Sequence, residues 1–263
     1  MFKVTPCFLP DDGSVNYGKP IDETVGTENF SADYTFKYFG ESPLLKRGLK
    51  EAEEISDGKL SYSVNAVNGD STIKLFFDKS ADNSLKSECV RKFFGLVKDY
   101  VYAEFETTLT ERVFDLLKLK NKKISVSESF TGGRVVSELI KNAGVSAYLH
   151  EGIVSYSNLS KEERLSVKKE DIESHGAVSP EVAYAMAAGL LYTGYCDIAV
   201  STTGIAGPGS DNTLKPVGLC YIGVGTREGI DVYKYVFSGN REEITEKGKN
   251  AALFRTIKKL KTL

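Results

Sequence analysis

The sequence predicts an α/β fold in two parts: a C-terminal three-layer α/β/α domain with a mixed sheet, preceded by a small α+β domain. Three observations favour it. In the second half, short apolar runs typical of buried strands alternate with segments of helical period. In the first half, two alternating runs flank Asn68-Gly69-Asp70, a hairpin turn signal. A length of 263 residues allows one large or two small domains.

Three segments follow from this pattern. Residues 1–30 are rich in Asp, Gly, Pro and Thr and have little apolar periodicity, so we expect an arm or linker without assigned chemistry. Residues 31–107 form the small domain, and residues 108–263 form the larger one.

The small domain is expected to have the order β-α-β-β-α-β. Tyr34, Phe36 and Tyr38 alternate as in a half-buried strand, and Ser42-Pro43 is typical of a helix start. The further elements are strands at 60–67 and 71–77, a helix at 84–99 and a strand at 101–105. This order predicts a small sheet with both helices on one face.

In the larger domain, apolar strands and amphipathic helices alternate, which predicts helices on both faces of a mixed sheet. The expected helices lie at 110–118, 132–143, 161–167, from Ser179-Pro180 onward, and at 242–261. The expected strands lie at 124–127, 152–156, 197–203, 217–226 and 230–237.

Composition narrows the function. The formal net charge is −2, whereas proteins that bind nucleic acid usually carry a basic excess, so a nucleic-acid partner is disfavoured. The four cysteines show no CxxC spacing, and no apolar stretch approaches the roughly 18 residues of a membrane span. We therefore expect a cytoplasmic protein without a membrane partner.

The two histidines, His150 and His175, have no cysteine or carboxylate at ligand spacing, so neither a metal nor another cofactor is expected. His175 is expected to order a turn.

Ligands of open α/β sheets bind beyond the carboxyl ends of strands, and three segments of unusual composition fall there. The first is residues 127–133, Ser-Glu-Ser-Phe-Thr-Gly-Gly. Ser129 would be held at the sheet edge as a nucleophile, and the N–H groups of Thr131, Gly132 and Gly133 could bind an anion or a developing oxyanion. Simple helix capping by Ser129 or Thr131 is the alternative.

The second segment runs from Tyr156 to Lys161, again between a strand and a helix. A lysine partly removed from water has a lowered pKa and could take a proton from a serine hydroxyl. Tyr156 could reach the same cavity. The alternative is a solvated lysine on the surface.

The third segment is residues 202–209, Thr-Thr-Gly-Ile-Ala-Gly-Pro-Gly, followed by Lys-Pro-Val-Gly at 215–218. Such a loop offers clustered N–H donors for a phosphate or carboxamide oxygen. It is neither a P-loop nor a dinucleotide fingerprint. An ordinary connection between strands is the alternative.

Together these motifs, with His-Gly-Ala-Val-Ser at 175–179 and a Gly-x-Arg at 239–241, resemble the CinA family in the same order over about residues 108–263. The resemblance implies an amidohydrolase that converts nicotinamide mononucleotide to nicotinate mononucleotide and ammonia. It also implies a homodimer without a metal.

The resemblance also assigns residues. Ser129, Tyr156 and Lys161 match the serine, tyrosine and lysine of the family motifs, so these three are expected to be catalytic, with Ser129 as the nucleophile and Lys161, relayed by Tyr156, as its base. The matches to the substrate-contacting loop and to the arginine of Gly-Asp-Arg are Thr203, Gly204, Ala206, Gly207 and Arg241. Two positions depart from the family pattern. Phe130 stands where the family often has cysteine, which leaves Ser129 as the nucleophile. Asn240 replaces the Asp before Arg241, which leaves the orientation of Arg241 open.

Residues 34–105 are similar to the small KH-like middle domain of full-length CinA proteins, but contain no GxxG loop of the kind that clamps a nucleic-acid backbone. The large N-terminal domain of those proteins has no counterpart here, so its metal-dependent pyrophosphatase activity is not expected. A nucleotide-binding or regulatory module that has lost turnover is the alternative function.

Overall fold

The computed structural model describes residues 4–6, 32–40, 43–209 and 214–263. By internal contacts the chain divides into two compact units. One comprises Leu9–Thr108, and the other comprises Leu109–Leu263 together with Met1–Phe8. Each unit has its own sheet and its own hydrophobic core.

The smaller unit has the predicted β-α-β-β-α-β order. Its elements are β2 (Tyr34–Phe39), α1 (Pro43–Ile55), β3 (Leu60–Val67), β4 (Asp70–Phe77), α2 (Asn83–Val97) and β5 (Val101–Ala103). The four strands form an antiparallel sheet in the order β3-β4-β2-β5. Asn68 and Gly69 turn the β3–β4 hairpin with φ of 50° and 78°.

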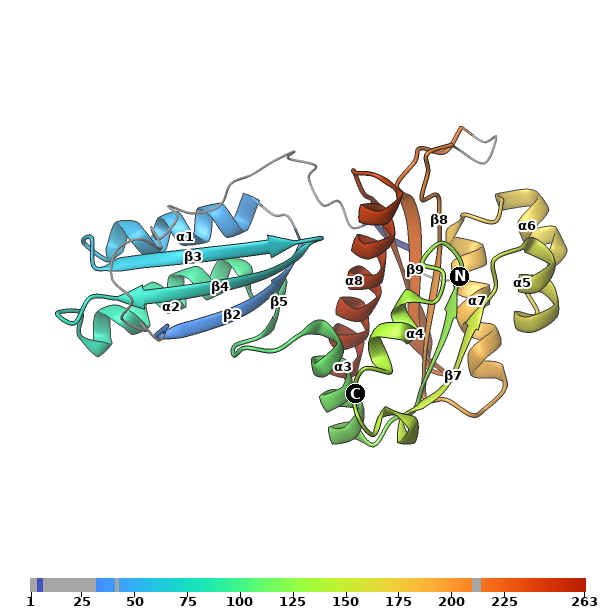
Figure 1. Cartoon of the computed structure of the whole chain (residues 1–263), viewed down its shortest axis with the longest axis horizontal. Helices are drawn as coiled ribbons and strands as arrows, with labels where there is room; N and C mark the ends of the chain where they lie inside the picture. The colour runs from blue at the N-terminus through green and yellow to red at the C-terminus, as the bar shows by residue number, and fades with distance from the viewer. Residues whose placement is uncertain (1–3, 7–31, 41–42, 210–213) are drawn as a thin grey trace. The chain divides into compact units, whose positions relative to one another are not determined.

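Both helices of this unit pack on the same face of the sheet, as predicted (Figure 1). Phe36 and Ile73 from the sheet meet Leu49 of α1 and Phe93 of α2 in one core. The rings of Phe36 and Phe93 lie 5.2 Å apart between centroids.

The larger unit contains a six-stranded mixed sheet, which confirms the predicted fold class. In spatial order it consists of β1 (Val4–Pro6), β10 (Gly229–Val236), β9 (Leu219–Thr226), β8 (Ile198–Gly204), β6 (Ile124–Glu128) and β7 (Leu149–Val154). Strands β7, β6 and β8 are parallel, so their carboxyl ends meet at one edge. Strand β9 runs antiparallel to both β8 and β10.

Helices cover both faces of this sheet, which gives three layers (Figure 1). On one face lie α3 (Leu109–Lys120), α4 (Arg134–Leu139) and α8 (Arg241–Leu260). On the other lies α7 (Pro180–Tyr192), with α5 (Asn158–Leu165) and α6 (Lys169–His175) packed against it. A short 3-10 turn at Val145–Ala147 leads into β7. Within the described ranges, no helix has the length and apolarity that crossing a membrane requires.

Strand β1 was not expected, because it lies in the segment assigned no element. Thr5 pairs with Tyr233 in a parallel ladder, so Val4–Pro6 extends the sheet of the larger unit. Three residues are too few to show a period, and only the neighbouring strand β10 makes them a strand.

Helix α6 was also missed, because Ile172 is its only buried residue and no apolar stripe marks it. The prediction that His175 orders a turn was wrong in detail, since His175 is the last residue of α6 and Gly176 caps it with φ of 80°. The residues around Ile172 form a helix because they pack on α7.

Two helix starts differ from the prediction. Helix α4 begins at Arg134 rather than 132, because Gly132 and Gly133 have φ of 61° and 95° and cannot continue a right-handed helix. Helix α5 begins at Asn158 rather than 161, after the N-cap Ser157 accepts a hydrogen bond from the Ser160 amide.

Candidate active site

A cleft of about 230 Å³ lies where the parallel strands β6, β7 and β8 end. Ser129 follows β6, Tyr156 follows β7, and Thr203 and Gly204 end β8. Together with Lys161 of α5 and Arg241 of α8, these residues line the cleft. The fold therefore brings the three segments singled out in the sequence to one place.

The centre of the cleft is a contact between Lys161 and Ser129. Lys161 Nζ lies 3.1 Å from Ser129 Oγ, and it also donates to the carbonyl oxygens of Ser155 at 2.8 Å and Tyr156 at 3.2 Å. Lys161 is 1% exposed and Ser129 is 9% exposed. An amine and a hydroxyl are thus held together largely out of water.

Burial lowers the pKa of Lys161 to about 8, because the charged ammonium loses its hydration. A neutral amine keeps two N–H donors and gains a lone pair. If the two N–H groups of the neutral amine donate to the two carbonyl oxygens, its lone pair is left for the Ser129 hydroxyl. The arrangement can therefore accept a proton from Ser129 near neutral pH.

Local sequence explains why Lys161 points inward. Lys161 and Leu165 are four residues apart on α5, and both are buried. The carbonyl of Leu165 approaches α7 so closely that a Cβ on Gly189 would collide with it. This close packing of α5 on α7 buries the face that carries the lysine.

The turn after β6 is fixed by hydrogen bonds to β8. The Ser129 amide donates to the Thr202 carbonyl at 3.0 Å, and the hydroxyls of Thr131 and Thr202 lie 2.6 Å apart. Thr131, Gly132 and Gly133 do not line the cleft. The side chain of Thr131 therefore contacts β8 and not the cleft.

The main-chain amides around Ser129 fall into two groups. Gly133 donates to the Glu128 carboxylate at 3.0 Å, and Gly132 donates to the Ser129 carbonyl at 3.1 Å. In contrast, the Phe130 and Thr131 amides donate to no group within the described ranges. The same is true of the Ala206 and Gly207 amides. Phe130, Ala206 and Gly207 line the cleft, whereas Thr131 does not, so these three N–H groups can donate to a bound oxygen.

Arg241, the first residue of α8, also lines the cleft. Its guanidinium donates to the Gly207 carbonyl at 2.6 Å and to the Tyr156 hydroxyl at 2.9 Å. Asn240 caps α8 through a capping box with Glu243, so the asparagine at this position keeps the helix start in place. The orientation of Arg241 is thereby defined.

Tyr156 contributes to the site in two separate ways. Its carbonyl accepts from Lys161, whereas its hydroxyl is bonded to Arg241, and its side chain is 61% exposed. Within the described ranges, no hydrogen bond links that hydroxyl to Lys161 or Ser129.

The floor of the cleft includes a loop that the sequence did not assign to the site. Ala177 and Val178 line the cleft. The Thr203 hydroxyl donates to the Ala177 carbonyl at 2.7 Å, and Lys215 donates to the Val178 carbonyl at 2.7 Å. The motif residues Thr203 and Lys215 thus hold this loop, and the His-Gly-Ala-Val-Ser pattern was the signal that it adjoins the site.

Phe130 is packed rather than reactive. Its ring is 5% exposed and fills the space beside two glycines, Gly204 of β8 and Gly248 of α8. A Cβ at Gly248 would collide with the ring, and one at Gly204 would lie 3.0 Å from it. The phenylalanine therefore forms a wall of the cleft.

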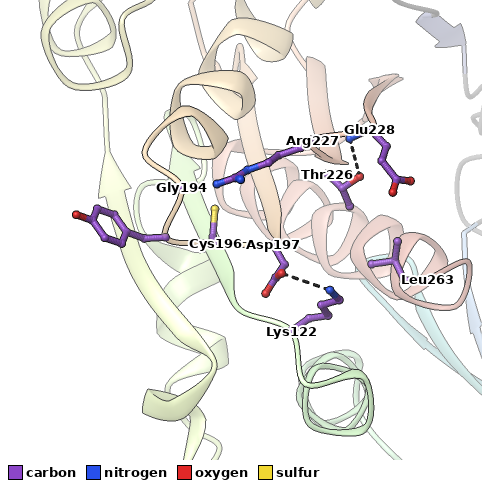
Figure 2. Close-up of a pocket in the computed structure, with 9 residues that line it drawn as sticks. Lys122, Gly194, Cys196, Asp197, Thr226, Arg227, Glu228 and Leu263 are labelled. Carbon is purple, nitrogen blue, oxygen red and sulfur yellow. Dashed lines mark hydrogen bonds and ion pairs between the residues drawn. The ribbon is translucent and has the colours of Figure 1, made fainter.

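A second cavity of about 280 Å³ lies near the amino ends of β6 and β8 (Figure 2). It contains the Lys122–Asp197 ion pair at 3.3 Å and the side chains of Cys196 and Arg227. Burial raises the pKa of the Cys196 thiol, which stays protonated and donates weakly to the Leu190 carbonyl. This cavity lacks an activated nucleophile.

In the part of the chain that is described, no group of three or more His, Cys, Asp or Glu side chains could hold a metal ion.

Comparison with known proteins identifies the larger unit. The family profile "CinA C-terminal domain" matches residues 106–260. A CinA-like protein of Fusobacterium nucleatum is 41% identical over 174 residues, which cover 65% of this chain and 42% of that protein. A CinA-like protein of Chlorobium phaeobacteroides is 45% identical over 159 residues, which cover 59% and 38%. The match thus spans less than half the length of these relatives.

Solved structures agree. A CinA superfamily protein from Klebsiella pneumoniae is 28% identical with a TM-score of 0.57, and the match covers 59% of this chain and 97% of that one. The competence/damage-inducible protein CihA from Agrobacterium tumefaciens is 33% identical with a TM-score of 0.53, covering 57% and 95%. The chain belongs to the CinA family, and its residues 106–260 are a CinA C-terminal domain.

Proposed function

We propose that the larger unit hydrolyses the carboxamide of nicotinamide mononucleotide to nicotinate mononucleotide and ammonia. The observation that carries this proposal is the buried amine of Lys161 at 3.1 Å from Ser129 Oγ. A serine activated by a lysine of lowered pKa suits attack on an amide carbon without a metal. The motifs shared with CinA proteins support the choice of substrate.

The first step forms a tetrahedral intermediate on Ser129. Neutral Lys161 takes the proton of the Ser129 hydroxyl while Oγ bonds to the carboxamide carbon, and the carbonyl electrons move to its oxygen. The Phe130 amide, or the Ala206 and Gly207 amides, would stabilise that oxyanion. One such donor typically contributes about 2.7–4 kcal/mol.

The second step releases ammonia and then acid. As the carbon–nitrogen bond breaks, Lys161 gives its proton to the leaving nitrogen, and the carbonyl re-forms as an ester of Ser129. Water then adds to the ester while Lys161 takes its proton, and as the bond between the carbon and Ser129 Oγ breaks, Lys161 gives that proton to Oγ. One amide and one water thereby yield one carboxylic acid and one ammonia, and Lys161 ends as it began.

The negative phosphate of the substrate is proposed to bind beside Arg241. This guanidinium lines the cleft and is already aligned by Gly207 and Tyr156. Arginine is well suited to phosphate because its N–H groups form a planar fork.

The test is an ammonia-release assay on nicotinamide mononucleotide. Ser129→Ala and Lys161→Ala should each lower kcat about a thousandfold or more. Lys169→Ala serves as the control, because Lys169 is an exposed lysine whose contact is a 3.7 Å ion pair with Glu173. Normal ammonia release by Ser129→Ala would refute the proposal.

A variant of the mechanism has Ser129 orient a water molecule for direct attack. Mass spectrometry of the protein mixed with substrate distinguishes this variant from attack by Ser129, since only the covalent route adds a nicotinoyl nucleotide mass to Ser129. Tight substrate binding with no ammonia would instead favour a nucleotide-binding or regulatory module that has lost turnover.

We also propose a cytoplasmic role in pyridine nucleotide recycling and a homodimeric assembly, as the CinA resemblance implies. Light scattering of the purified chain checks the assembly. A mass of one chain at micromolar concentration would contradict it.

A further inference from the structure

Glu128, the residue before Ser129, has a carboxylate that no step of the proposed reaction uses. It is fully buried, with an exposed fraction of 0%. Its Oε2 accepts hydrogen bonds from the amides of Gly133 at 3.0 Å and Val135 at 3.1 Å, and its Oε1 accepts from Val136 at 2.9 Å. This side chain therefore binds the amides at the start of α4.

The main chain of Glu128 leads to the other half of the Ser129–Lys161 pair. Its carbonyl accepts from the Ser155 amide at 2.8 Å, and the Ser155 carbonyl accepts from Lys161 Nζ at 2.8 Å. Glu128 is thus covalently joined to Ser129 and connected to Lys161 through one intervening residue, Ser155.

The two sets of contacts act on the same short turn. Residues 129–133 run from the end of β6 to the start of α4, and the Glu128 side chain spans this turn from one end to the other. Three N–H donors on a buried carboxylate compensate for its lost hydration, and loss of the carboxylate would leave those amides unpaired. The turn that carries Ser129 would then lose the hydrogen bonds that hold its two ends together.

We propose that Glu128 is a positioning residue, which holds Ser129 Oγ at the distance from Lys161 that proton transfer needs. The proposal rests on the proposed function for its kinetic readout. Because the amides of Gly133, Val135 and Val136 already donate to Glu128, they do not bind the substrate phosphate, which is placed beside Arg241.

The decisive variant is Glu128→Gln, which keeps size and one oxygen acceptor but places an N–H₂ group against amide donors. Glu128→Ala removes all three bonds. Glu138→Gln is the matched control, since Glu138 is a carboxylate of α4 that pairs with Lys141 and Lys249 and does not line the cleft. Thermal unfolding of each protein shows which variants fold.

Two readouts are compared. In the ammonia assay, Glu128→Gln should lower kcat about 100-fold with KM within about threefold, because a displacement of about 1 Å costs that much. In a second assay without substrate, a fluorophosphonate probe labels Ser129, and intact mass gives the rate. Glu128→Gln should slow labelling by a similar factor, Glu128→Ala at least as much, and Glu138→Gln should leave both rates unchanged.

The outcomes separate this inference from the proposed function. A wild-type protein that is labelled at Ser129 but releases no ammonia contradicts the substrate assignment, and labelling still tests Glu128. Labelling of folded Glu128→Gln at the wild-type rate overturns the positioning role. So does a raised KM with unchanged kcat, which would mean that Glu128 serves binding alone.

Discussion

Lys161 Nζ and Ser129 Oγ are 3.1 Å apart although 32 positions separate the residues in the chain. The parallel pairing of β6 with β7 explains the meeting, because both strands deliver their following loops to the same sheet edge. Ser129 comes directly after β6, and Lys161 comes from the helix that follows β7. The contact is thus a consequence of strand direction and helix register.

The rate should depend on pH through Lys161. With a pKa of about 8, the amine is about one-tenth neutral at pH 7 and about half neutral at pH 8, so kcat/KM should rise about fivefold between them. From pH 8 to 9 the rise should be less than about twofold. Initial rates in a constant-ionic-strength buffer check this, and a flat profile over pH 6.5–9 would exclude Lys161 as the base.

Stability should also follow this pKa. The folded-state pKa of Lys161 is about 8 and the ordinary value is 10.5, so between these pH values the unfolded chain holds a proton that the folded chain has lost. Unfolding then takes up a proton, and the free energy of unfolding should rise with pH by up to about 1.4 kcal/mol per unit in this window. Urea unfolding at pH 8 and 10 measures it, with Lys161→Met as the reference from which the rise should be absent.

Tyr156→Phe should separate the two roles open to this residue. The change removes the hydroxyl that Arg241 contacts at 2.9 Å and leaves the carbonyl that holds Lys161. We expect kcat within about threefold of wild type and KM raised about tenfold, because the loss of one hydrogen bond to a charged group weakens binding by about that factor. Steady-state kinetics decide, and a kcat loss of about 100-fold would instead make the hydroxyl a proton relay.

Gly248→Ala should destabilise the larger unit, because its Cβ would collide with the Phe130 ring. Overpacking of this kind typically costs about 1–3 kcal/mol. Denaturant unfolding should show that the cost is smaller when Phe130→Ala is also present, so the double variant is more stable than the sum of single effects predicts. Additive effects would mean that the ring has room to move.

The strands and the motif positions could be predicted because they depend on local pattern. Short apolar runs marked β6 and β8, and glycines and prolines marked the loops that follow. The meeting of Ser129 and Lys161 at one edge then followed from the rule for parallel strands, whereas Arg241 was assigned only by the resemblance to the CinA family.

For Lys161, the sequence left two alternatives open, a desolvated amine of lowered pKa and a solvated surface lysine, and local pattern alone could not decide between them. A lysine in the first turn of a helix is usually solvated, and this one is buried only because α5 packs closely on α7 at Gly189. The role of Glu128 was hidden for a similar reason. Its neighbours in sequence are serines, while its partners are main-chain amides five to eight residues away.

The lysine side chain also folds back on the segment from which it comes. Lys161 donates to the carbonyls of Ser155 and Tyr156, six and five positions earlier, so this short stretch closes a ring around its own amine. These two hydrogen bonds require a fixed number of residues between the carbonyl groups and the lysine. One residue inserted between Tyr156 and Lys161 would turn the lysine by about 100° around the helix axis. Length variation in this loop should therefore abolish the amine's contact with Ser129 while the surrounding sheet still folds.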